Sequence, residues 1–77
     1  MTLQMKPVIS SNIGTIGYDA PKERLCVQFQ NGKCYEYTGV PGSTFVDLIT
    51  AESTGKAFNT LIKNGGFEFK QIELDEI

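Results

Sequence analysis

An Asn-Gly pair between two alternating runs of residues most constrains the fold of this chain. Apolar and polar side chains alternate along residues 24–29, and a second run rich in β-formers covers residues 33–38. Such alternation is typical of strands with one buried face. The intervening Asn31 and Gly32 tolerate the positive φ angles that a tight reversal needs. The segment therefore predicts an antiparallel hairpin.

The pairing register of this hairpin depends on the length of its loop. A two-residue loop would place Cys34 and Glu36 opposite the apolar row of the first strand. A three-residue loop over 30–32, with Gly32 left-handed, instead pairs Leu25 with Tyr37 and Val27 with Tyr35. Aliphatic–aromatic pairs stabilise a sheet by roughly 0.2–1 kcal/mol each, and a slip of one residue turns the whole face over. We therefore predict the three-residue loop.

The same register determines whether the two cysteines can form a disulfide. Cys26 and Cys34 become diagonal neighbours on the other face of the hairpin. Diagonal positions lie roughly 7–8 Å apart, which is beyond comfortable disulfide reach. Residues 1–7 lack the apolar run of a signal peptide, and no stretch is long enough to span a bilayer. We expect two half-buried, reduced thiols in a cytoplasmic protein that does not bind membranes.

The remaining elements follow from changes in periodicity. Residues 13–19 and 67–72 alternate as strands. Two short helices are predicted between them, one capped by Ser43 and one by Ser53. Their apolar stripes are Phe45, Leu48 and Ile49, and Phe58, Leu61 and Ile62. The order β-β-β-α-α-β predicts an α+β domain: a small, curved antiparallel sheet with a helical pair packed on one face.

A chain of 77 residues has room for one domain. We assign it to residues 8–72, between an N-terminal tail (1–7) and an acidic C-terminal tail (73–77). The net charge is −2, but without the last five residues the chain has seven basic and six acidic residues. The net negative charge of the chain therefore comes from the tail.

Composition argues against catalysis. Histidine is absent, which removes the commonest general base and the commonest metal ligand. Two cysteines cannot complete a four-ligand zinc site. We therefore expect no enzyme activity, no metal and no cofactor, and we expect a binding module.

Two surfaces are candidates for nucleic-acid binding. Lys56, Asn59 and Lys63 recur on one face of the second predicted helix, whose N-terminus begins at Ser53. Lysine and asparagine donors suit a phosphate backbone, and free amides at a helix start attract anions. The simpler interpretation is that Ser53 only caps the helix and that the stripe is its solvated face.

The second candidate surface is the hairpin. Tyr35 and Tyr37 share a strand face, as do the aromatic residues that stack unpaired bases on RNA-binding sheets, and Lys33 lies beside them. The predicted register pairs both tyrosines with Leu25 and Val27. That pairing favours a place in the core.

Taken in order, short fragments of the chain resemble the KTSC family, a domain named after the C-terminus of some lysyl-tRNA synthetases. The resemblance covers about residues 8–64, and its fragments are Ser10-Ser11, Ile13, Gly17-Tyr18-Asp19, Leu25, Val27, Phe29, Gly32, Tyr35, Tyr37, Val40-Pro41, Ala51, Ser53, Gly55, Phe58-Asn59 and Ile62. The family occurs as an appended domain and as small separate proteins in bacteria and their phages. It implies an RNA-binding role, for which the hairpin and the helix at Ser53 are the matching surfaces.

Two functions follow as hypotheses. The first is a module that binds RNA, through its phosphates and unpaired bases, or belongs to an RNA-handling complex. Its site would comprise Lys33, Tyr35, Tyr37, Ser53, Lys56, Asn59 and Lys63. The second is a protein-interaction module, of the kind with which a phage inhibits a host nucleic-acid enzyme, with the acidic tail in a basic groove. Either a monomer or a homodimer is compatible with the sequence.

Overall fold

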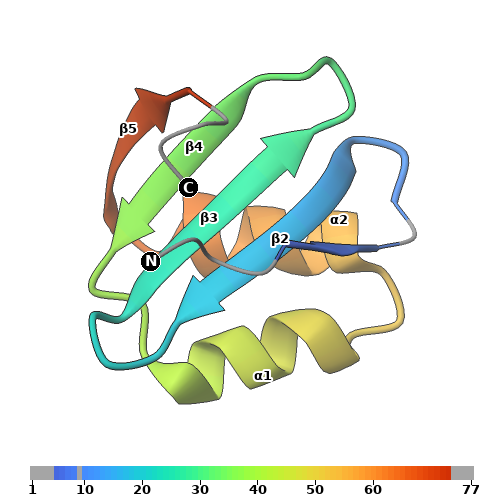
Figure 1. The fold of residues 1–77 in the computed structure, drawn as a ribbon. Coiled ribbons are helices and arrows are strands. Elements are labelled where there is room, and N and C mark those ends of the chain that lie inside the picture. The colour runs from blue at the N-terminus through green and yellow to red at the C-terminus, as the bar shows by residue number, and fades with distance from the viewer. Residues whose placement is uncertain (1–4, 9, 74–77) are drawn as a thin grey trace.

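The chain folds into an antiparallel meander with its helices inserted before the last strand. The computed structural model describes residues 5–8 and 10–73, and Figure 1 shows their arrangement. The sheet has the order β1-β2-β3-β4-β5. The elements are β1 (Lys6–Pro7), β2 (Ile13–Asp19), β3 (Arg24–Phe29), β4 (Cys34–Thr38), α1 (Gly42–Thr50), α2 (Thr54–Phe58), the π-helical turn η1 (Asn59–Lys63) and β5 (Glu68–Ile72).

This arrangement confirms the predicted α+β fold, with one strand added at its start. β1 pairs with β2 and lies within the segment that sequence assigned to the N-terminal tail. Its two residues include Pro7, and so short a strand has no alternation from which it could be recognised. Of the predicted acidic tail, only Glu73 lies among the described residues.

The hairpin has the predicted register. Val27 pairs with Tyr35 and Leu25 with Tyr37. The loop spans 30–32, where Gly32 adopts a φ of 88° and its N–H donates to the carbonyl of Phe29 at 2.9 Å. This geometry is a turn followed by a left-handed glycine, and it excludes the two-residue loop.

The strand before the hairpin contains a β-bulge. The pairing of β2 with β3 shifts between Ile13 and Thr15. A Cβ at the intervening Gly14 would lie 3.3 Å from the carbonyl oxygen of Gln28, so the glycine allows this close approach. The bulge lies beside the loop that precedes β2, at the rim of the candidate site described below.

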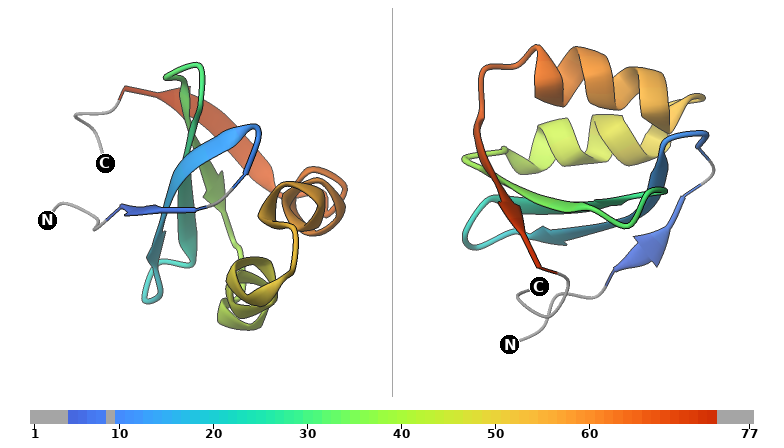
Figure 2. Two further views of the ribbon diagram at one scale, coloured as in Figure 1. Left: turned by 90° about the vertical axis from the view of Figure 1, so that its right-hand side faces the viewer. Right: turned by 90° about the horizontal axis from the view of Figure 1, so that it is seen from above.

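The helical elements form a second layer on one face of the sheet (Figure 2). The predicted cap of α1 is wrong: the N-cap is Pro41, whose carbonyl accepts from the N–H of Phe45 at 3.2 Å. Because the extended Pro41 already leads into the helix, Ser43 falls inside the first turn. Leu48 is buried as predicted, but Ile49 is 46% exposed. Within the described residues, no helix is long and apolar enough to cross a membrane.

The main core lies between the sheet and these helices. Tyr18 attaches α1 to the sheet, because its ring stacks on Phe45 at 4.5 Å and its hydroxyl donates to the carbonyl of Val40 at 2.6 Å. Burial of apolar side chains is the main stabilising contribution in a domain of this size. The buried members of this core are Ile13, Ile16, Leu25, Val27, Tyr37, Val40, Leu48, Phe58 and Ile62.

The opposite face of the sheet carries a smaller cluster that contains both thiols. Cys26 and Cys34 are free, occupy diagonal positions as predicted, and pack with Ile72 and Met5. The prediction of half-buried thiols is wrong, because β5 and the β1 segment bring these apolar side chains over them and bury both completely. Burial raises the pKa of both thiols, so they stay protonated at neutral pH.

Candidate functional site

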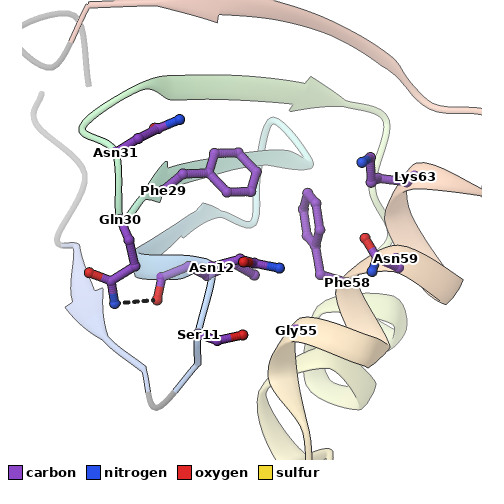
Figure 3. Close-up of a pocket in the computed structure, with 10 residues that line it drawn as sticks. Ser11, Asn12, Phe29, Gln30, Asn31, Gly55, Phe58, Asn59 and Lys63 are labelled. Atoms are coloured by element: carbon purple, nitrogen blue, oxygen red, sulfur yellow. Dashed lines mark hydrogen bonds between the residues drawn. The ribbon is translucent and has the colours of Figure 1, made fainter.

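A cavity with both polar and apolar lining opens where the second helical segment meets the loops at one end of β2 and β3. Its volume is about 370 Å³, and we call it the amide pocket (Figure 3). One wall is the loop before β2, another is the β3–β4 loop, and the third is α2 with η1. The lining residues are Ser11, Asn12, Ile13, Phe29, Gln30, Asn31, Gly55, Phe58, Asn59 and Lys63.

The loop before β2 is held in place by its own hydrogen bonds. The Oγ of Ser10 accepts from the backbone N–H groups of Asn12 and Ile13, both at 3.2 Å. From the β3–β4 loop, the Nε2 of Gln30 donates to the backbone carbonyl of Ile13 at 3.3 Å. The backbone N–H of Gln30 donates to the backbone carbonyl of Asn12 at 2.7 Å. These bonds attach the loop to the hairpin and hold its outer residues at the rim of the pocket.

A glycine allows the helical wall to approach this loop. A Cβ at Gly55 would lie 3.0 Å from the Oγ of Ser10, which is tighter than almost any ordinary contact. The predicted cap of this helix is confirmed, because the Oγ of Ser53 accepts from the N–H of Lys56 at 3.3 Å. The sequence pattern therefore predicted the helix start, whereas the close approach at Gly55 is a finding of the structure.

The predicted second helix changes its winding at Asn59. In η1, the N–H of Asn64 donates to the carbonyl of Asn59, five residues back, at 3.1 Å. Phe58 and Ile62 are buried as predicted, and Lys63 is exposed. Wide turns of this kind occur often at functional sites. Here the turn directs Asn59 and Lys63 to the same pocket.

A second cavity, the aromatic pocket, adjoins β4 and β5. Its volume is about 400 Å³, and its lining residues are Phe29, Tyr35, Tyr37, Ile62, Lys63, Phe67 and Phe69. The Phe69 ring is 64% exposed and packs on Tyr37 with ring centres 5.5 Å apart. Tyr35 is partly buried, and the centre of its ring lies 6.3 Å from the centre of the Phe69 ring.

Tyr37 belongs to the core and forms a wall of this pocket. It is only 5% exposed, and its ring meets Phe58 edge-on at 5.5 Å. Burial, followed by the charge of neighbouring Tyr35, raises the pKa of its phenol. The predicted core placement is therefore confirmed for Tyr37, whereas Tyr35 keeps part of its ring open to solvent.

The two pockets are adjacent because Phe29 and Lys63 line both of them, and we call the two pockets together the groove. Phe29 meets Phe58 on one side at 5.5 Å and Tyr35 on the other at 5.6 Å. An aromatic floor thus runs from one pocket to the other. Lys63 places a positive charge at the junction.

Four of the seven predicted site residues meet in this groove: Tyr35, Tyr37, Asn59 and Lys63. The other three, Lys33, Ser53 and Lys56, line neither pocket. All three are exposed, and the side chain of Ser53 caps the helix.

The sequence analysis did not identify several residues of the groove. Asn12 and Asn31 lie in loops, and their approach to η1 depends on the folded arrangement of distant segments. Phe69 had a detectable signal, since it shares a strand face with Phe67 in the predicted last strand. The resemblance fragments were a further signal: Ser11 lies far from Gly55 and Asn59 in the sequence, yet all three line the amide pocket.

Metal ligation is not indicated by the part of the chain that the structure describes. No group of three or more cysteine, aspartate or glutamate side chains lies together there. Carboxamide, hydroxyl and aromatic groups dominate the groove instead. These groups can hydrogen-bond and stack, which are the interactions of a binding site.

The fold defines a small α+β domain with a helical layer on one face of the sheet, and two adjacent pockets lie where this layer meets the strands and loops. A family model described as the KTSC domain matches residues 9–67. The chain belongs to the KTSC domain family. Its fold resembles the crystal structure of a KTSC domain protein from Yersinia pestis, with a TM-score of 0.86 and 38% identity. That similarity covers 92% of this chain and 99% of the Yersinia protein.

Two sequence relatives differ in how much of their own length the similar segment covers. A protein of Tsukamurella paurometabola is 44% identical over 59 residues, which cover 77% of this chain and 88% of that protein. A lysine–tRNA ligase of Nostoc punctiforme is 40% identical over 62 residues. These residues cover 80% of this chain and 11% of the ligase, so the similarity concerns a small part of that enzyme.

Proposed function

We propose that this chain is a non-catalytic, cytoplasmic module that binds single-stranded RNA in the groove formed by the amide and aromatic pockets. The observation that carries the proposal is that three kinds of group line two adjacent pockets. Solvent-open aromatic rings line one pocket, carboxamides line the other, and Lys63 lines both. Single-stranded RNA offers the faces of unstacked bases, base edges and phosphates to these three kinds of group.

The aromatic pocket supplies the stacking surface. Phe69 is largely exposed and Tyr35 partly so, and both belong to adjacent strands. Base–aromatic stacking contributes about 1–3 kcal/mol per base in single-strand binders. We therefore replace Tyr37 by Phe69 in the stacking hypothesis: Tyr35 and Phe69 stack bases, and Tyr37 packs against Phe69 from the core side.

Positive charge is limited, and this sets the expected strength of binding. Lys63 lies in the groove, and Lys33 and Lys56 are exposed on the elements that form its rims. Each lysine that neutralises a phosphate adds to affinity and to its salt dependence. Three such contacts suit a weak, salt-sensitive module that acts within a larger RNA-handling complex.

The similarity to the Nostoc enzyme supports an RNA-binding function. An enzyme whose name is lysine–tRNA ligase contains a segment similar to this chain. A small domain appended to an enzyme of that kind is well placed to contact its RNA substrate. We extend the same kind of contact to this chain.

A salt titration with labelled oligonucleotides tests the proposal. Fluorescence anisotropy should show binding of single-stranded RNA and of tRNA at about 50 mM salt, with affinity falling as salt rises. Lys63→Ala should weaken binding, and Lys22→Ala, in the turn after β2, is the matched control. Absence of binding to either RNA at that salt concentration would overturn the proposal.

A protein-interaction role is the second candidate, favoured by exposed apolar side chains. Val46 and Ile49 are 52% and 46% exposed on α1, and Phe69 lies on the edge strand β5. Such a surface and edge suit a protein partner, a host nucleic-acid enzyme inhibited by a phage protein, or a second copy of the chain. Recovery of a partner from native cells that survives nuclease, and weakens when residues 73–77 are deleted, would favour this role over RNA binding.

A further inference from the structure

We infer that the amide pocket takes one unpaired adenine base by its Hoogsteen edge, while the aromatic pocket stacks the next base without regard to its identity. The inference rests on the proposed function and adds a base preference to it. It follows from which polar groups face each pocket and which of them are already engaged.

Two carboxamides in the amide pocket are free to bind a ligand. Gln30 is engaged with the carbonyls of Ser10 and Ile13, and the Oδ1 of Asn31 accepts from the N–H of Lys33 at 3.0 Å. Within residues 5–8 and 10–73, the carboxamides of Asn12 and Asn59 make no hydrogen bond. Figure 3 shows them on opposite walls of the pocket, one from the loop before β2 and one from η1.

A carboxamide presents one donor and one acceptor side by side. On its Hoogsteen edge adenine presents the complementary pair, an amino donor beside a ring-nitrogen acceptor, and asparagine is a common bidentate partner for that edge. On the same edge guanine presents two adjacent acceptors, for which arginine is the usual partner, cytosine presents only its amino donor, and uracil presents only a carbonyl acceptor. The pocket lining contains neither arginine nor a carboxylate, so its carboxamides match the Hoogsteen edge of adenine best.

The pocket also suits a flat heterocycle in size and floor. Its volume of about 370 Å³ lies within the range of roughly 300–1,000 Å³ that small-ligand sites occupy. Phe29, which is partly buried, and Phe58 lie at right angles on its floor with ring centres 5.5 Å apart. A base held between Asn12 and Asn59 would contact these rings.

The aromatic pocket should contribute affinity without preference. Its lining has rings, an isoleucine and Lys63, and no carboxamide. Every base has a π-face, so stacking there tolerates any sequence. Lys63, shared by both pockets, then lies where the phosphate between two successive nucleotides would pass.

Anisotropy with two oligonucleotides of about nine nucleotides tests the inference. One is all uridine, and the other has a single central adenine. The wild-type chain should bind the adenine-containing strand about tenfold more tightly. Asn59→Ala and Asn12→Ala should each reduce this ratio, because they weaken binding of the adenine-containing strand more than binding of the uridine strand. Asn64→Ala, an exposed asparagine at the end of η1 outside both pockets, should keep the ratio.

The outcomes separate this inference from the proposal beneath it. Equal binding of the two strands by the wild type, or an undiminished ratio in the Asn12→Ala, Asn59→Ala double variant, overturns the adenine pocket and leaves RNA binding intact. Failure of the wild type to bind either strand overturns both. Because Asn12 and Asn59 are exposed, the variants should fold, and a native ¹H–¹⁵N spectrum verifies this for each.

Discussion

The two faces of the sheet are covered in different ways. Helices cover one face (Figure 2), where side chains of β3, β4 and β5 line part of the groove. Among the residues that the structure describes, no helix covers the other face. There, Met5 and Ile72 bury the two thiols, and Arg24 lies 3.6 Å from Glu36 in an ion pair.

The difference teaches where a ligand can gain most. On the open face, several neighbouring side chains pair with one another: besides the ion pair of Arg24, whose Nε is buried without a partner among the described residues, the hydroxyl of Thr15 donates to the Oε1 of Gln28 at 3.1 Å. On the helix side, Phe69 is left 64% exposed, and the solvent-exposed carboxamides of Asn12 and Asn59 line a cavity. Accessible carboxamides near exposed rings favour binding on the helix side.

The largest expected effect comes from removing the side chain that joins sheet and helices. Phe58 is 2% exposed and contacts both Phe29 and Tyr37. Phe58→Ala should lower the free energy of unfolding by about 3–5 kcal/mol, because it leaves a cavity in the core. Urea denaturation measures this loss. Phe69→Ala should cost far less stability, and equal losses would contradict the distinction between core and groove rings.

The second effect concerns affinity without stability. Phe69→Ala should weaken the binding of every single-stranded RNA by about 1–3 kcal/mol, since it removes an exposed stacking surface. Anisotropy titrations with uridine and adenine-containing strands measure the loss. Val46→Ala removes an exposed apolar side chain from α1, away from the groove, and serves as the control. A loss limited to one sequence would contradict a sequence-tolerant stack.

Substituting one lysine on each face of the sheet compares the two faces directly. Lys63 lies in the groove, whereas Lys70 pairs across the sheet with Glu36 on the open face. Lys63→Ala should reduce the salt dependence of RNA affinity by about 0.7 of a logarithmic unit per unit of log salt, the value for one phosphate contact on a single strand. Lys70→Ala should leave the slope unchanged. An identical salt dependence of RNA affinity in the two variants would contradict a binding site on the helix side of the sheet.

The smallest expected effect is a pH dependence that belongs to the open face. Burial raises the pKa of Cys26 and Cys34 above their ordinary value of 9.0. The unfolded chain therefore loses thiol protons first as pH rises, and stability that is fully present at neutral pH should fall from about pH 8 upward. Urea denaturation across this range should show a flatter profile for the Cys26→Ala, Cys34→Ala double variant. An unchanged profile would mean that the thiols do not cause it.

Local sequence determined most of the sheet. Alternation and the left-handed Gly32 specify the register of β3 and β4, because a slip of one residue would expose the apolar row. The start of α1 was not predictable in the same way. Pro41 and Ser43 both suit a helix start, and only the extended backbone of Pro41 leading out of the sheet decides between them.

The groove was predictable only in part. Lys63 and Asn59 were found because a helical face displays them at regular spacing, although the π turn at η1 carries no sequence signature that periodicity detects. Asn12 lay beyond such reasoning, since its place depends on the bonds that Gln30 makes across the molecule. Side chains brought together by loops need the fold before they can be recognised as a site.

A ¹H–¹⁵N titration of the wild-type chain with the single-adenine strand tests the central claim most directly. The account predicts chemical-shift changes at Asn12, Asn59, Lys63 and Phe69, including the side-chain amides of the two asparagines. It predicts unchanged resonances for Glu36 and Lys70 on the open face. Shifts concentrated on the open face, or a spectrum unaffected by the strand, would contradict RNA binding in the groove.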